Sequence, residues 1–299
     1  MNRSGGDGRI NVCGEQLREL SFSYPLRLMS PSSRSKHRDV YMLSHGGGLV
    51  GGDEVKLQVV VEGGGSLSLL TQGSTKVFKQ SESNPKPTRS IVQAHIHPSS
   101  LLSIIPEQVT PFADSVFEST QTILLNPVEA SLILLDWFSS GRIHMNESFK
   151  FKSYESRVAL LVPCVCASKT RNKELLRDAW LLKGAEAERD AFGYTCFGSL
   201  ILMGPKVKTI IDNAVSQFES ISIGISAKQK VDTDLSWSLS RIFRRDLCPC
   251  LGVSGGGEEL VGVVIRFCAV ESLLAQTLLS QLLKGLDTIT CSEMPSSFR

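Results

Sequence analysis

The feature that most constrains this chain is a series of short, strand-like segments between Val40 and Phe138. Four of them alternate between apolar and polar positions or are rich in β-branched residues, at 55–61, 66–72, 89–97 and 131–138. Gly, Asn and Pro residues stand between these segments, and such residues reverse a chain. Several strands at this regular spacing indicate an all-β region.

Helical patterns occur only in the second half of the chain. Apolar residues recur at spacings of three and four over 207–220, which predicts a helix. Residues 272–285 predict another, with Ser272 placed to cap it and Gly285 to end it. Segments 199–203 and 260–270 favour strands, whereas 173–191 is rich in helix formers and predicts either one helix or an irregular crossover.

The length of the chain is usual for about two domains, but a single β-rich domain can also reach this size. The 299 residues are 41% hydrophobic, which is enough for a large core, and no internal repeat or linker divides the chain. We therefore expect one mainly β domain with two or three helices over residues 36–288. Residues 1–35 are rich in Ser, Gly and Arg and predict a flexible segment, and 289–299 a frayed tail.

Charge and apolar runs limit the classes of partner. The net charge is +2 and the two signs are mixed evenly, so no basic surface for nucleic acid or for a membrane is expected. The longest apolar stretches, such as 157–167, fall short of the roughly 20 residues that span a bilayer. The N-terminus lacks the apolar run of a secretory signal, and the 8 cysteines are scattered, so a cytoplasmic protein with free thiols is expected.

A glycine-rich segment, HGGGLVGGD at 45–53, invites a nucleotide-binding interpretation. A dinucleotide fingerprint needs a helix directly after it to hold the pyrophosphate, but residues 54–62 alternate as a strand. The segment Gly73-Ser74-Thr75-Lys76 has the Walker A residues in the wrong order and is also followed by a strand pattern. A structural turn between strands is the favoured interpretation of the glycines.

A serine hydrolase is a further alternative, because HGGG resembles a lipase oxyanion loop and Ser254 lies in a G-x-S-x-G pattern. In that fold the catalytic histidine follows the nucleophile. All 5 histidines of this chain precede Ser254, and a strand pattern follows it where a helix is needed. The order of these residues argues against the hydrolase, and no catalytic residue is assigned.

Two histidines and two cysteine pairs are weak metal candidates. His95 and His97 lie at i and i+2 on one face of a strand. The cysteines form two C-x-C pairs, namely Cys164 with Cys166 and Cys248 with Cys250. A structural zinc site would show a second pair at a set spacing, so no firm metal ligand and no tightly bound cofactor is expected.

Transient contact with a metal ion is left open, because imidazole and thiolate suit late divalent metals such as nickel or zinc. A metal-binding storage or sensor protein that uses these His and Cys pairs is the alternative function.

One acidic residue stands in an otherwise apolar strand. Asp136 occurs within SLILLDWF, and an unpaired buried carboxylate would cost several kcal/mol. We expect that it either faces a wet cavity or strand end, or that it forms an ion pair, with Arg142 as the candidate partner.

The chain resembles the family of urease accessory proteins called UreD, or UreH in some bacteria. The segments that carry the resemblance, in order along nearly the whole chain, are HGGGLVGGD (45–53), TQGSTKVFK (71–79), VTPFADSVF (109–117), LLDWFSSGRIHMNESF (134–149) and the terminal strand VVIRFCA with its following helix. Each motif alone is weak, but their order and separation are specific. Two features depart from the family pattern: His45 stands where small or amide residues are common, and 145–147 replace a Gly-Glu turn.

The resemblance implies strands that wind into a superhelical two-sheet fold, and a scaffold rather than an enzyme. Such a protein binds apo-urease and a UreF-like partner, which recruits a UreG-like GTPase, and together they deliver nickel to urease. It also implies an internal polar passage, whose matching positions here are Asp53, Ser74, Thr75 and Asp136. The remaining motif positions are expected to be structural, namely Gly47, Gly48, Gly51, Gly52, Lys76, Arg142 and Glu147.

Overall fold

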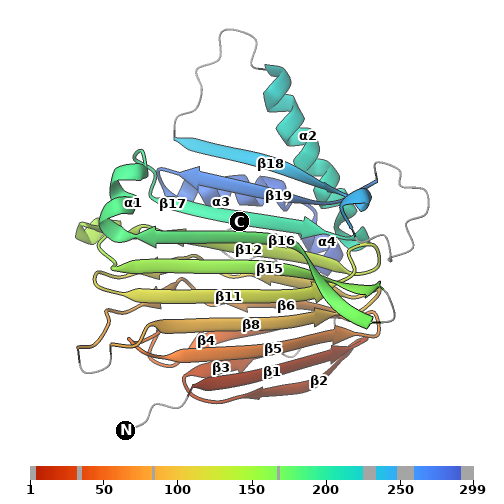
Figure 1. The fold of residues 1–299 in the computed structure, drawn as a ribbon, viewed down its shortest axis with the longest axis horizontal. Helices are drawn as coiled ribbons and strands as arrows, with labels where there is room; N and C mark the ends of the chain where they lie inside the picture. Colours follow the sequence, from red (N-terminus) through yellow and green to blue (C-terminus); the bar gives the residue numbers. More distant parts are fainter. Residues whose placement is uncertain are drawn as a thin grey trace.

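The protein is represented by a computed structural model, which describes residues 5–31, 36–82, 85–166, 169–224, 234–247 and 259–290. Within these residues two large β-sheets, A and B, pack face to face, and helices cover the far side of sheet B (Figure 1). The mainly β fold predicted from the sequence is confirmed, and the two sheets agree with the arrangement that the family resemblance implied.

Sheet A is largely parallel. Its seven strands in spatial order are β16 (Lys169–Lys183), β15 (Ser153–Cys166), β11 (Val116–Leu125), β8 (Thr88–Ile96), β5 (Glu54–Glu62), β1 (Gly6–Cys13) and β2 (Gln16–Phe22). The strands from β15 to β1 are parallel, whereas β16 and β2 join the two edges in antiparallel fashion.

Sheet B is mixed. Its main path runs through β18 (Leu235–Phe243), β19 (Leu260–Ala269), β17 (Cys196–Met203), β12 (Ser131–Ser139), β9 (Leu101–Ile105), β6 (Ser66–Thr71), β4 (His37–Ser44) and β3 (Leu26–Met29). Two short strands, β7 (Thr75–Val77) and β10 (Val109–Pro111), pair with each other beside this path. A separate hairpin consists of β13 (Gly141–Arg142) and β14 (Glu147–Ser148).

From β4 to β15 the chain alternates between the two sheets. It passes from β4 in sheet B to β5 in sheet A, and continues through β6, β8, β9, β11 and β12 to β15. Each new strand lies parallel beside the preceding strand of its own sheet. Parallel neighbours need a crossover connection, and here a strand of the opposite sheet supplies it. The result is the superhelical winding that the family resemblance implied.

Two apolar cores follow from this layering. The first lies between the sheets and is filled by inward residues such as Val59, Leu69 and Phe138. The second lies between sheet B and the helices and includes Leu135, Ile210 and Leu279. Because β12 borders both cores, all of its residues are buried, which explains its nearly continuous apolar sequence.

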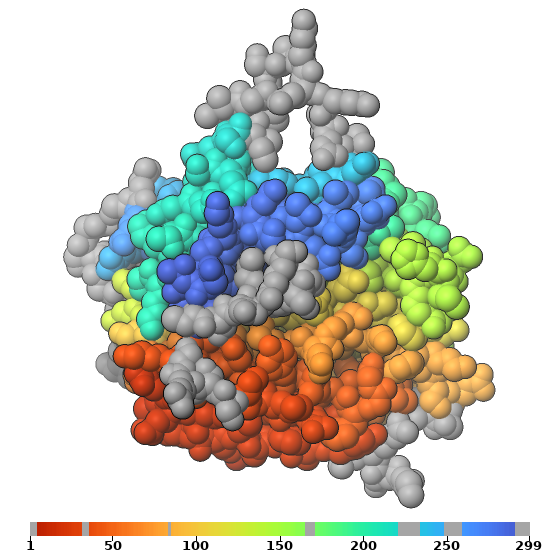
Figure 2. Space-filling model, turned by 180° about the vertical axis from the view of Figure 1, so that it is seen from behind, coloured from red at the N-terminus to blue at the C-terminus, as the bar shows by residue number. Residues whose placement is uncertain are grey.

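The helices follow the second half of the chain. Those in the described residues are α1 (Gly184–Asp190), α2 (Lys208–Gly224), α3 (Ser272–Leu282) and α4 (Leu286–Thr290). The two longer helices, α2 and α3, are those that the sequence predicted, and α1 and α4 are short additions. Seen from behind, the C-terminal elements in blue cover the upper part of the molecule, above the N-terminal strands in red and orange (Figure 2). None of the described helices is long and apolar enough to span a membrane.

Three local expectations differ from the structure. Most of 173–191 is strand β16, because its alternate residues from Leu176 to Leu182 face the inter-sheet core and its backbone pairs with β15. Residues 6–29, within the segment expected to be flexible, form β1, β2 and β3, since Ile10 and Val12 are buried on alternate positions. The N-cap of α3 is Glu271 without a side-chain cap, and the Ser272 hydroxyl instead bonds to Gln108.

Candidate functional site

The glycine-rich loop is fastened to strand β7 by backbone contacts. The amide of Leu49 donates to the carbonyl of Lys76 at 2.8 Å, and the amide of Phe78 donates to the carbonyl of Leu49 at 2.9 Å. A Cβ atom at Gly48 would lie 2.4 Å from Phe78 Cε2 and 2.8 Å from the Lys76 carbonyl oxygen, so only glycine fits. The loop is therefore packed as a structural element.

The other loop residues contribute in different ways. Gly51 approaches the backbone of 79–81 as closely as Gly48 approaches β7, and Gly47 and Gly52 have positive φ angles of 74° and 85°. Asp53 is buried and its Oδ2 accepts a 2.9 Å hydrogen bond from the amide of Val50. This contact closes the loop on itself at the start of β5.

A pocket of about 410 Å³ lies beside this loop. Ser74 and Thr75 line it, together with Gly46, Gly47 and inward apolar residues of both sheets. The side chain of Lys76, next in the chain, is exposed. Two of the four residues expected in a polar passage therefore meet in one pocket, whereas Asp53 closes the loop and Asp136 lies deeper between the sheets.

Asp136 faces the inter-sheet core from β12 and is 7% exposed. Its Oδ2 accepts a 2.7 Å hydrogen bond from the hydroxyl of Ser156, which points inward from β15 of the opposite sheet. The pKa of Asp136 is raised to about 6, chiefly by burial; the Ser156 hydrogen bond lowers it and the nearby charge of Asp178 raises it. The carboxyl group is thus poised to change its charge near neutral pH.

Polar residues extend from Asp136 along the inner face of both sheets. Ser199 on β17 is the direct cross-strand neighbour of Asp136, and Arg266 on β19 is the neighbour of Ser199. Arg266 reaches across to sheet A, where its Nε and Nη2 lie 3.0 and 2.8 Å from Oδ1 of Asp178. We call these five residues, Asp136, Ser156, Ser199, Asp178 and Arg266, the inner polar row.

Two polar atoms of the inner polar row make no hydrogen bond within the part of the chain that the structure describes. Among the described residues, the Ser199 hydroxyl and Oδ2 of Asp178 are buried and have no hydrogen-bond partner. Arg266, at the other end, lines an open pocket of about 360 Å³ together with Trp180, Trp237 and the exposed Phe192. The row therefore connects a buried carboxylate with solvent at the margin of the two sheets.

Arg142 does not pair with Asp136. Its Nε donates to Oε2 of Glu147 at 2.7 Å, a second bond joins Nη2 to Oε1, and its guanidinium lies over the ring of Phe112. Glu147 in turn accepts from the amide of Ala113 at 3.4 Å. The carboxylate holds the pKa of Arg142 above its usual value, and these contacts fasten the β13–β14 hairpin to the preceding segment.

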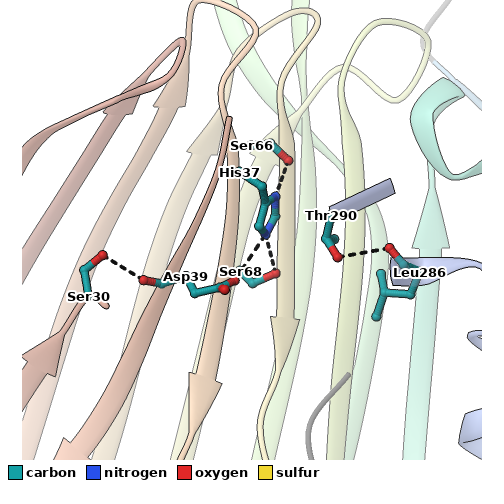
Figure 3. A network of polar contacts seen from close by, with 7 residues as sticks. All are labelled: Ser30, His37, Asp39, Ser66, Ser68, Leu286 and Thr290. Atoms are coloured by element: carbon teal, nitrogen blue, oxygen red, sulfur yellow. Dashed lines mark hydrogen bonds and ion pairs between the residues drawn. The ribbon is translucent and has the colours of Figure 1, made fainter. Parts of the chain in front are cut away.

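Another polar network joins β4 to β6 on the helix side of sheet B (Figure 3). His37 is 3% exposed, and its two ring nitrogens lie 2.6 and 2.8 Å from the hydroxyls of Ser66 and Ser68. Asp39 approaches Nε2 of the same ring at 3.4 Å, and Thr290 of α4 donates to the carbonyl of Leu286 nearby. Since both ring nitrogens have partners, this network acts as a link between parallel strands.

The two histidines that the sequence marks as metal candidates lie side by side. His95 is in β8 and His97 directly follows that strand, and their ring centroids are 4.0 Å apart. Burial and then the neighbouring His97 lower the pKa of His95. The described residues hold no group of three or more His, Cys, Asp or Glu placed to bind a metal together.

The cysteine candidates are not gathered into one site by the described part of the chain. Cys248 and Cys250 both lie outside the described residues, as does Ser254, and of the other pair only Cys164 has a described side chain. The side chain of Cys164 is buried. Metal binding by the pair of Cys248 and Cys250 therefore stays a prediction.

Sequence reasoning missed four members of the inner polar row. Arg266 interrupts an apolar strand, VVIRF, in the same manner as Asp136, so the same signal could have found it. Asp178 could not be recognised, because its segment, 173–191, is rich in helix formers and was not predicted to be a strand. Ser156 and Ser199 could not be found, because their significance depends on which strands lie across from β12 and beside it.

The structure is a wound, mainly β fold of two sheets with a polar row between them. A family model described as UreD urease accessory protein matches residues 8–296. The chain therefore belongs to the UreD family of urease accessory proteins.

Relatives from fungi, plants and bacteria match large parts of the chain. A protein of Schizosaccharomyces pombe described as urease accessory protein ureD-like is 32% identical over 223 residues, covering 72% of this chain and 76% of that protein. Urease accessory protein D of Arabidopsis thaliana is 28% identical over 280 residues and covers 89% of this chain and 90% of its own. UreD of Sorangium cellulosum is 35% identical over 208 residues, with 67% and 62% covered. This membership supports a role in urease maturation.

Proposed function

We propose that this protein is a maturation scaffold that binds apo-urease together with a UreF-like protein and a UreG-like GTPase and helps to deliver nickel to the urease active site. In this proposal the chain carries out no covalent chemistry of its own. The nucleotide is hydrolysed by the GTPase partner, in keeping with a glycine-rich loop that is packed against β7 by its backbone.

The observation that carries the proposal is the inner polar row. A hydrated cation that moves through protein needs oxygen ligands that attract it without enclosing it. The carboxylates of Asp136 and Asp178, the hydroxyls of Ser156 and Ser199, and the open pocket beside Arg266 offer such oxygens between the sheets. Transport through protein would also protect nickel from competing ligands in bulk solution, because nickel is not the metal that such ligands bind most tightly.

The inner polar row contains one positive charge, the guanidinium of Arg266, which affects how the row can attract a cation. Arg266 neutralises Asp178 at the solvent end, whereas the carboxyl group of Asp136 lies at the buried end without a cationic partner among the described residues. Near neutral pH the ionised form of Asp136 would attract a divalent cation toward the interior.

The proposal is tested by reconstitution. Apo-urease is incubated with Ni²⁺, GTP, the UreF-like and UreG-like proteins, and with or without this chain, and nickel bound to re-purified urease is then counted by metal analysis. We expect co-purification of the chain with the UreF-like protein and a several-fold higher nickel content of urease when the chain is present. Equal nickel content with and without the chain would reject the proposed function.

A further inference from the structure

The outer face of sheet A carries a pair of histidines that the fold brings together without an evident structural reason. His95 and His97 are separated by one residue near the end of β8, and side chains at i and i+2 of a strand point to the same face. His95 is exposed and His97 is half-buried. Their rings are tilted by 33° with centroids 4.0 Å apart.

Neither imidazole is used by the protein itself. In the described part of the chain no backbone group or side chain makes a hydrogen bond to either ring, in contrast to His37, whose two nitrogens are both paired. The ring nitrogens of both side chains are therefore available to an external ligand.

The next two strands of sheet A, β5 and β1, carry further polar side chains on this face. Glu62 ends β5 next to the pair, and its charge acts on His95. Glu62 is only weakly engaged by Arg18, at 3.7 Å, and lies opposite the free thiol of Cys13 on β1. Asn11, two residues before Cys13, has a buried side-chain oxygen without a hydrogen-bond partner among the described residues.

We propose that His95 and His97 form an open, two-imidazole site for a late first-row divalent cation on the outer face of sheet A, with no third His, Cys, Asp or Glu of the described residues placed to share the ion. Metal–nitrogen bonds are about 2.1 Å long, so two ligating nitrogens lie about 3 Å apart, which rotation of two rings at this separation can meet. Imidazole suits nickel, copper and zinc, whereas magnesium and calcium prefer oxygen ligands. The remaining coordination positions are open to water, so the bound ion exchanges readily.

This site does not depend on the proposed function, because it rests on residues away from the inner polar row. The probe is Ni²⁺ alone, added to the full chain. Diethyl pyrocarbonate modifies accessible neutral imidazoles, and mass spectrometry then reports each histidine separately. We expect Ni²⁺ to protect His95 and His97 strongly while the exposed His144 is modified as before, and Mg²⁺ to protect neither.

Variants provide the second measurement. The double variant His95→Gln/His97→Gln should bind Ni²⁺ about tenfold or more weakly by calorimetry, since two linked ligands act at high effective concentration. His144→Gln is the matched control and should bind as the wild type does. Unchanged Ni²⁺ affinity of the double variant, or equal modification of His95 and His97 with and without Ni²⁺, would overturn the proposal.

Discussion

The hydroxyl of Ser156 on β15 donates a 2.7 Å hydrogen bond to Oδ2 of Asp136 on β12, so a polar contact joins the two sheets within their shared apolar core. A buried carboxylate of this kind is costly, because the hydrogen bond only partly replaces water. Its raised pKa, about 6, reflects that cost. A group that lowers stability and is nevertheless present suggests a role other than folding.

The first prediction concerns pH and Asp136→Asn. The pKa of Asp136 is raised to about 6 in the folded protein, so between about pH 4 and pH 6 the folded state keeps a proton that the unfolded state releases. The contribution of this group to stability is therefore present at low pH and is lost as the pH rises through about 6. Two pKa units correspond to about 3 kcal/mol.

Urea unfolding of the wild type and of Asp136→Asn at pH 4 to 7.5 measures this effect. As the pH rises, the free energy of unfolding of the variant should increase relative to that of the wild type. Above pH 6.5 the variant should be the more stable protein, because burying an amide costs less free energy than burying a carboxylate. A difference between the two proteins that does not change with pH would contradict the raised pKa.

A second prediction concerns the ion pair between Asp178 and Arg266. The side chain of Asp178 is 7% exposed and that of Arg266 42%, so Arg266→Gln leaves a buried carboxylate without its cation. Because Arg266 is itself partly exposed, we expect the free energy of unfolding to fall by about 2 kcal/mol, less than for a fully buried ion pair. The double variant with Asp178→Asn should be less destabilised than the sum of the single variants, whereas strictly additive effects would show that the pair is not coupled.

A third prediction concerns the glycine-rich loop. Gly48→Ala places a Cβ atom 2.4 Å from Phe78 Cε2 and 2.8 Å from a backbone carbonyl, which should cost about 3 kcal/mol of stability through overpacking. Gly46→Ala in the same loop is the matched control. A Cβ atom at Gly46 meets no atom within 4 Å, but the φ angle is 82°, so a loss of only about 1 kcal/mol is expected. Thermal unfolding would contradict the packing argument if Gly48→Ala were the milder of the two substitutions.

The sequence predicted the strands that have one clear face. Strand β5 alternates between buried and solvent-facing positions, and β12 is nearly continuously apolar because it borders both cores, so each pattern was recognisable within the segment itself. Strand β16 was ambiguous, because its charged outward residues are also good helix formers and only its pairing with β15 decides its conformation.

The candidate site was less accessible to such reasoning. Asp136 could be recognised from its apolar surroundings alone, and Arg266 shares that signal. Their arrangement in one row depends on the register between β12, β17 and β19, and the contact with Ser156 depends on which strands face each other across the core. Neither the register nor the facing of these strands can be predicted from the local sequence.

The measurement that tests the central claim most directly is the nickel content of urease matured with Asp136→Asn. The control is Asp212→Asn, which removes an exposed carboxylate of α2 that pairs with Lys208 at 3.3 Å. We expect Asp136→Asn to bind the UreF-like protein normally and to be at least as stable as the wild type at pH 7.5, yet to leave urease with several-fold less nickel, whereas Asp212→Asn supports full loading. Full nickel loading by Asp136→Asn would contradict the proposed passage between the sheets.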